Sequence, residues 1–360
     1  MKLWTSIAVL AVMWMAGCAS PGAPQPPSLR IPAPVSDLAA TRKGENVLLT
    51  WTPATQTSDG ENIRQAGKTL VCRSLTQAAM VQCGTPVATQ DTQVEHYTKE
   101  AMVSRQDATD TLPESAMTQN PTGFATYALE DQNPRGQSAG LSNQVRVPLA
   151  PTLPAPAGVE AKVVSEGVQL GWTDPNAIPR NAALSFLYRV FRRSEEGNKP
   201  EVIVGEVAIE NAHPELLDRN IEWGQKYLYR IAPITRVEQT RGEAIEVEGD
   251  DSPIVMVEAV DRFAPEAPSG LQAVFSGPGQ KPFVDLTWAP NLEADLAGYN
   301  VYRREGGAQA VKINAEVVPT PSFRDANVQP GREYFYSVAA VDARGNESAK
   351  SEETSEKVPQ

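Results

Sequence analysis

A pattern of three short strands around one tryptophan constrains the fold of this 360-residue chain most strongly. Residues 284–290, 298–304 and 334–342 alternate apolar with polar side chains and are rich in β-branched and aromatic types, as half-buried strands are. Turn-forming Gly, Pro, Asn or Asp residues bound each run. Burying Trp288 removes roughly 150–250 Å² from water, worth about 4–6 kcal/mol as an upper estimate. We therefore expect Trp288 at the centre of a two-sheet core.

These residues resemble those of a fibronectin type III domain. In that family the second-strand tryptophan is followed closely by proline, as Trp288 is by Pro290, and the third strand carries Tyr-x-Val, as at Tyr299. A Gly-x-x-Tyr corner then opens the sixth strand, as at Gly331 and Tyr334. The resemblance implies an immunoglobulin-like sandwich in which the corner hydroxyl bonds back to the backbone.

The pattern occurs twice more upstream, which indicates internal repeats. In the second copy the second-strand tryptophan is Trp172 and the corner tyrosine is Tyr227. In the first copy the second-strand tryptophan is Trp51. In the first copy the third strand is expected at residues 69–73 and the sixth near 124–129, with no clear corner tyrosine. We assign five residues to the structural core: Trp51, Trp172, Trp288, Tyr227 and Tyr334.

The repeats predict an all-β chain of tandem fibronectin type III-like β-sandwiches. Short proline-rich joints separate the copies, which suits separate modules better than the alternative of one large all-β domain. We expect the following organisation: a signal peptide at 1–17, a lipidated cysteine and Pro-rich spacer at 18–31, and domains at 32–150, 151–262 and 263–360.

The N-terminus has the features of an export signal. Lys2 precedes an apolar run at residues 3–15, which is too short to cross a bilayer and ends in Ala16, Gly17 and Cys18. This ending resembles the lipobox of bacterial lipoproteins, which implies that Cys18 becomes a lipid-modified N-terminus. The alternative is an ordinary secretory signal with a chance cysteine.

A lipid on Cys18 would make the membrane a partner of this chain. Two or more acyl chains hold a protein firmly, whereas one binds marginally. Ala19 follows Cys18 where an aspartate typically retains lipoproteins at the inner membrane, so the resemblance favours the outer membrane. The spacer that follows is expected to be extended.

The two remaining cysteines suit an oxidising compartment. Cys72 lies on the expected third strand of the first domain, and Cys83 follows residues 80–82. A disulfide across this strand pair would contribute roughly 3 kcal/mol. The alternative is a pair of buried free thiols.

Two segments are longer than a sandwich requires. Residues 91–123 form a polar insert in the first domain, and residues 236–253 form an acidic loop in the second. The acidic loop contains four carboxylates: Glu246, Glu248, Asp250 and Asp251. They could hold Ca²⁺, although their spacing matches no calcium loop and acidic loops are usually only solvated.

Little in the composition favours catalysis or nucleic acid. The only histidines, His96 and His213, belong to different domains, so we expect no zinc site, no Ser–His–Asp triad, no cofactor and no enzymatic activity. A net charge of −12 disfavours nucleic acid. Two pairs of adjacent arginines, at residues 192–193 and 303–304, are interpreted as the exposed ends of third strands.

The sequence therefore favours a non-catalytic, lipid-anchored protein of the cell envelope that displays or spaces binding surfaces for protein or glycan. The alternative is an accessory subunit of an envelope or carbohydrate-processing complex. A third hypothesis is a hydrolase that uses paired carboxylates in the first domain. The fold alone does not choose among them.

Overall fold

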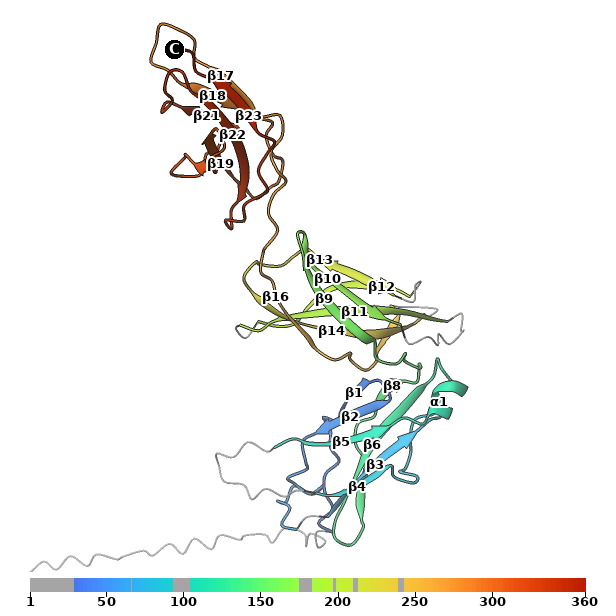
Figure 1. Ribbon diagram of the computed structural model, residues 1–360. Helices are drawn as coiled ribbons and strands as arrows, with labels where there is room; N and C mark the ends of the chain where they lie inside the picture. The colour runs from blue at the N-terminus through green and yellow to red at the C-terminus, as the bar shows by residue number, and fades with distance from the viewer. Residues whose placement is uncertain are drawn as a thin grey trace, which may run out of the picture. The chain divides into compact units, whose positions relative to one another are not determined.

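The computed structural model describes residues 29–65, 67–92, 104–174, 183–196, 199–209, 213–238 and 243–360. Its strands form six sheets (Figure 1), and neighbouring strands within each sheet are antiparallel. The chain divides into two compact units, Met1–Leu149 and Ala150–Gln360. The first unit contains one β-sandwich, and the second unit contains two. The fold is therefore all-β and fibronectin type III-like, as predicted.

The first sandwich pairs a three-stranded sheet with a five-stranded one. The smaller sheet has the order β1 (Ala39–Lys43), β2 (Asn46–Trp51), β5 (Gln106–Thr111). The larger sheet has the order β4 (Ala88–Asp91), β3 (Lys68–Ser74), β6 (Phe124–Gln132), β7 (Ser138–Leu141), with β8 (Val145–Pro148) also paired to β6. A short helix, α1 (Glu114–Gln119), lies between β5 and β6 in the chain.

The second sandwich repeats this arrangement. Its smaller sheet has the order β13 (Glu215–Asp218), β10 (Gly167–Thr173), β9 (Ala157–Val164). Its larger sheet has the order β12 (Val202–Ala208), β11 (Leu184–Ser194), β14 (Lys226–Val237), β15 (Ile245–Glu248), with β16 (Val255–Glu258) also paired to β14.

The third sandwich has three and four strands. Its smaller sheet has the order β17 (Gln272–Phe275), β18 (Val284–Thr287), β21 (Ser322–Asp325). Its larger sheet has the order β20 (Val311–Lys312), β19 (Leu296–Glu305), β22 (Glu333–Asp342), β23 (Thr354–Lys357). The same strand order thus occurs three times along the chain.

Each sandwich is held by its own apolar cluster. Because side chains alternate along a strand, Val47, Leu49 and Trp51 on β2 all face inward, where they meet Tyr127 and Leu129 of the opposite sheet. The second and third sandwiches have equivalent clusters around their own tryptophans. A fourth, smaller cluster contains Ala150, Leu184, Val237 and Val247.

The segment 91–123, expected to be an insert, contains elements that the sandwich needs. Strand β5 pairs with β2 along its whole length, and the helix α1 contributes Ala116 and Met117 to the core. Residues 93–103 lie outside the described part of the chain. Within the described residues, no helix is long and apolar enough to cross a membrane.

Candidate functional site

The three predicted tryptophans lie in three different apolar clusters. Trp51, Trp172 and Trp288 are 0%, 3% and 6% exposed. Trp172 meets Tyr188 edge-to-face with ring centroids 5.6 Å apart, and Trp288 meets Tyr299 in the same way at 5.1 Å. Each tryptophan therefore serves the core of its sandwich.

The corner tyrosines are also buried. The hydroxyl of Tyr227 accepts a hydrogen bond from the Glu222 amide at 2.8 Å, and that of Tyr334 accepts one from Gln329 at 2.9 Å. Ala125 holds the corresponding position on β6 in the first sandwich, and Met117 of α1 packs into the same core. The first sandwich thus has a small residue where the other two have the corner tyrosine, and α1 adds Ala116 and Met117 to its core.

A set of three polar side chains, which the sequence did not lead us to expect, occurs in each sandwich. An arginine on the third strand binds an aspartate that closes the neighbouring small sheet, and a tyrosine on the sixth strand donates to the same carboxylate oxygen. The sets are Arg73, Asp110 and Tyr127; Arg192, Asp218 and Tyr229; Arg303, Asp325 and Tyr336. The Arg–Asp distances are 2.6, 2.7 and 2.7 Å, and the Tyr–Asp distances are 2.7, 2.9 and 3.0 Å.

These sets are structural. Burial, and the hydrogen-bonded carboxylate beside each ring, raise the pKa of Tyr127, Tyr229 and Tyr336 far above the ordinary tyrosine value. The tyrosines therefore stay protonated and keep donating. Arg192 and Arg303 are largely buried against their aspartates, so the interpretation of the two pairs of adjacent arginines as exposed strand ends was wrong for their first residues. A buried ion pair of this kind is costly to break by removing one partner.

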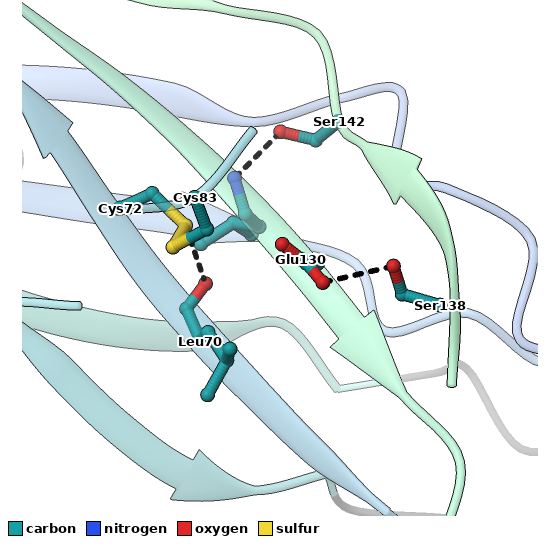
Figure 2. The surroundings of a disulfide bond; sticks show 7 residues. Leu70, Cys72, Cys83, Glu130, Ser138 and Ser142 are labelled. Carbon is teal, nitrogen blue, oxygen red and sulfur yellow. Dashed lines mark hydrogen bonds between the residues drawn. A yellow bond between two sulfur atoms is a disulfide. The ribbon is translucent and has the colours of Figure 1, made fainter. Parts of the chain in front are cut away.

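Cys72 and Cys83 form a disulfide, as predicted, with Cα atoms 5.3 Å apart. Figure 2 shows the bond beside β6, close to Glu130, whose carboxylate accepts a hydrogen bond from Ser138. Cys72 is on β3, but Cys83 lies in the loop between β3 and β4 and not on a strand. Since both sulfurs are bonded to each other, the grouping of Cys72, Cys83 and Glu130 is not a set of thiolate metal ligands.

Three of the four carboxylates named in the acidic segment 236–253 are paired with arginines: Glu246, Glu248 and Asp251. Strand β15 lies within it, and Glu246 shares Arg189 and Arg236 with Glu206 in a closed ring of ion pairs at 2.5–2.8 Å. Among the remaining acids of the segment, Glu248 and Asp251 both bind Arg230.

These ion pairs lower the pKa of the two glutamates in the ring. Burial opposes the shift, but the hydrogen bonds from Arg189 and Arg236 outweigh it at Glu206 and Glu246. Carboxylates held in this way stay charged and hold the outer face of the larger sheet together.

A second carboxylate group lies in the described part of the chain. Oxygens of Asp261, Asp295 and Asp342 lie within 4.8 Å of one another. Asp342 is already engaged, because its carboxylate accepts from the amides of Arg344 and Asn346 and from the Asn346 side chain. Its pKa is lowered by these hydrogen bonds, despite the opposing effect of burial.

The N-terminal assignments and the two histidines remain to be placed. Cys18, the apolar segment before it and His96 lie outside the described residues. His213 is exposed and precedes β13, where it lines a hollow on the second sandwich.

This hollow is the candidate binding surface of the chain. It has a volume of about 520 Å³ and lies over the outer face of the sheet β13–β10–β9. Its rim carries polar side chains on all three strands: Glu160, Lys162, Gln169 and Glu215. The Gln169 amide donates to Glu215 at 2.7 Å and Lys162 pairs with Glu160 at 2.9 Å, so the rim offers both donors and acceptors.

A glycine lies in the wall of the hollow. Gly171 is on β10, directly before the buried Trp172, so its missing side chain would point outward. A Cβ atom built at Gly171 meets no other atom within 4 Å. The residue before the tryptophan is Thr50 in the first sandwich and Thr287 in the third. At Gly171 the second sandwich thus departs from the residue pattern that the other two share.

Comparisons with known proteins identify short related segments. No model of a known protein family matches the chain. The amylopullulanase of Thermoanaerobacterium thermosulfurigenes is 47% identical over 91 residues, or 24% of this chain and 4% of that enzyme. The amylopullulanase of Thermoanaerobacterium saccharolyticum is 44% identical over 96 residues, or 26% of this chain and 7% of that enzyme.

The similarity is local, since this chain spans only 4% and 7% of the length of these two enzymes. Among solved structures, the FN1–FN3 domains of chicken CNTN1 align with 91% of this chain and 100% of that chain, at 15% identity and a TM-score of 0.26.

Proposed function

We propose that this chain is a non-catalytic, lipid-anchored protein of the cell envelope that displays a binding surface for glycan or protein. The observation that carries the proposal is the hollow at Gly171 on the second sandwich. Its volume is typical of ligand sites, and its rim carries amide, carboxylate and ammonium groups. Such groups pair with the hydroxyls of a sugar or with polar groups of a protein.

The non-catalytic role is supported by how the buried carboxylates are used. Asp110, Asp218 and Asp325 each hold an arginine and a tyrosine in place. A general acid or base needs a carboxyl that can exchange its proton with a substrate. Carboxylates that are saturated by internal donors are better suited to stabilising a scaffold.

The second candidate function is that of an accessory component in carbohydrate processing. The matching segments of the amylopullulanases are 91–110 residues long, which is about the length of one sandwich of this type. They form a small share of those enzymes, which supports a role beside the catalytic part. This similarity favours α-glucans such as amylose and pullulan as the first ligands to test.

Binding of these glucans by the mature, full-length chain tests the proposal. We expect retention on insoluble amylose or retardation by pullulan in a native gel. Gly171→Thr gives the second sandwich the residue that its neighbours have. The added side chain should project into the hollow and weaken binding at least tenfold. Thr287→Val, at the equivalent position of the third sandwich, is the matched control and should bind as before. Undiminished binding by Gly171→Thr would remove the hollow from the proposal.

The anchor is tested separately. Inhibiting the lipoprotein signal peptidase should leave a larger, unprocessed precursor if Cys18 carries the lipid. Cys18→Ala should have the same effect. A chain that is processed normally in both cases would be a secreted protein and not a lipoprotein.

A further inference from the structure

A second pocket lies at one end of the first sandwich and is lined by three arginines. It has a volume of about 430 Å³ and is formed by three segments that are distant in the sequence. Arg30 comes from the segment before β1, Arg64 from the loop between β2 and β3, and Arg135 from the turn between β6 and β7. Three cationic side chains thus meet at one place in a chain whose net charge is −12.

Hydrogen bonds fix the three segments to one another. The amide of Ala33 donates to Gln56 at 2.9 Å, and the amide of Ser58 donates to Ile31 at 2.8 Å, so the N-terminal segment is paired with the β2–β3 loop. The side chain of Asn133, which is 6% exposed, donates to the Leu29 carbonyl at 3.2 Å. This contact ties the β6–β7 turn to the N-terminal segment.

Two of the three contributing segments, the β6–β7 turn and the β2–β3 loop, are also braced internally. The carbonyl oxygen of the Asn133 side chain accepts from the amides of Arg135 and Gln137 at 2.9 and 3.0 Å. The buried Thr57 hydroxyl bonds the Asp59 carboxylate and the Glu61 backbone. A backbone held in this way positions its side chains before a ligand arrives, which reduces the entropy lost on binding.

Arg30 has an unusual backbone conformation. Its φ is +51°, and among the described residues it is the only non-glycine with a positive φ. This region is disfavoured for residues with a Cβ atom, and such strain is concentrated at ligand sites and switches. The strained residue is one of the three arginines that line the pocket.

From these observations we infer that the pocket binds an oxyanion, a phosphate or carboxylate group of a small ligand. Arginine presents a planar fork of donors that matches the oxygens of both groups. Among the described lining residues Glu61 is the only acid, against three arginines. The pocket is in the first sandwich, so the inference is independent of the hollow on the second.

Calorimetric titration of the mature, full-length protein in a non-ionic detergent tests this inference. Inorganic pyrophosphate and citrate are the two probes, and they distinguish phosphate from carboxylate as the preferred group. Maltose is the uncharged control. We expect at least one of the anions to bind, with an affinity that falls as salt is added, because the attraction is electrostatic and partly exposed to solvent.

The variants are Arg64→Gln and Arg135→Gln, singly and together; both residues are exposed, so their replacement should leave the fold intact. Arg30 is kept because it also interacts within the protein. Each loss of a charge-assisted contact should weaken binding at least about tenfold. Arg146→Gln is the matched control, since Arg146 is exposed on β8 opposite Thr126, toward the other end of β6.

The inference fails if neither anion binds the unaltered protein. It also fails if the double variant binds as tightly as the original, or if Arg146→Gln weakens binding as much as Arg64→Gln does. Should the double variant unfold, each single variant still has to weaken binding on its own.

Discussion

The first and third sandwiches share a strand order but differ in how their cores are filled. In the third sandwich Trp288 packs edge-to-face on Tyr299, with ring centroids 5.1 Å apart. The corresponding position on β3 of the first sandwich is Thr69, whose hydroxyl donates to the buried carboxyl of Asp131 at 2.6 Å. Thr92 is also within hydrogen-bonding distance of Thr69. One sandwich thus has an aromatic pair where the other has a small polar cluster.

The two sandwiches also differ at the corner. Tyr334 ties the start of β22 to the preceding turn, whereas the first sandwich has Ala125 there, a helix before it and a disulfide. Both retain a buried tryptophan and the same Arg–Asp–Tyr set. The difference indicates that the central tryptophan and the polar set are the common requirements of this framework. The aromatic neighbour and the corner tyrosine can be replaced.

The largest effect should come from removing the shared tryptophan. Trp288→Ala is expected to cost about 3–5 kcal/mol, as large aromatic truncations in cores do. Trp51→Ala should cost less by roughly 0.5–1.5 kcal/mol, because among the described residues Trp51 has no edge-to-face tyrosine partner to lose. Hydrogen exchange of the strand amides measures each sandwich separately, which suits a chain of several modules.

The control for this comparison is Val311→Ala. Val311 is 60% exposed on β20, so its truncation should change stability by less than about 0.5 kcal/mol. If Trp288→Ala cost less than about 1 kcal/mol, the tryptophan would not be the centre of the third sandwich.

Reduction of the disulfide should distinguish the two units. Cys72 and Cys83 are 11 residues apart, and closing a loop of that length is worth about 3 kcal/mol in the chain-entropy account. A reductant should therefore lower the unfolding temperature of the first unit and leave the second unchanged. Differential scanning calorimetry with and without reductant measures this, and Cys72→Ser with Cys83→Ser should reproduce it. An equal shift in both units would point to a general effect of the reductant.

A smaller effect is expected at the corner. Tyr334→Phe removes the hydroxyl that accepts from the Gln329 amide, which should cost about 1 kcal/mol. Tyr227→Phe should do the same in the second sandwich. Tyr302→Phe is the control, because its hydroxyl reaches Glu347 at the surface and should matter by less than about 0.5 kcal/mol. Hydrogen exchange of the strand amides measures the stability lost in each variant. Equal losses of stability in all three would show that the corner has no special role.

The fold class could be predicted from the sequence because the tryptophan, the third-strand tyrosine and the corner tyrosine recur in order. The first sandwich was harder to align for a physical reason. Asp110 and Tyr127 are 17 residues apart, whereas the equivalent pairs in the other two sandwiches are 11 apart, and α1 lies in the longer connection. The aspartates that recur at equivalent positions in the three copies were the sequence signal for the polar sets.

The two pockets could not be predicted in the same way. Gly171 stands where the other two sandwiches have threonine, and this difference is informative only once the three copies are aligned and the residue is known to face outward. The arginine pocket joins Arg30, Arg64 and Arg135, which are brought together by loop pairing rather than by any local pattern. Sequence periodicity predicts helices and strands, but it does not predict which distant loops come together.

The smallest effect should be a pH dependence that belongs to the first sandwich. Burial raises the pKa of Asp131, and the hydrogen bond from Thr69 offsets this only in part. A carboxyl whose folded pKa is raised stabilises the fold fully below its unfolded pKa, and this contribution is lost as the pH rises through the folded value. Asp131→Asn keeps an oxygen that can accept from Thr69 but cannot ionise.

The variant should therefore match the original protein in acid and become relatively more stable as the pH rises toward neutrality. Thermal unfolding of the first unit across this range measures the difference. Glu130→Gln, on the opposite side of β6, is the control and should show no such divergence. Parallel curves for Asp131→Asn and the original protein would mean that the ionisation of Asp131 does not affect the stability of the first sandwich.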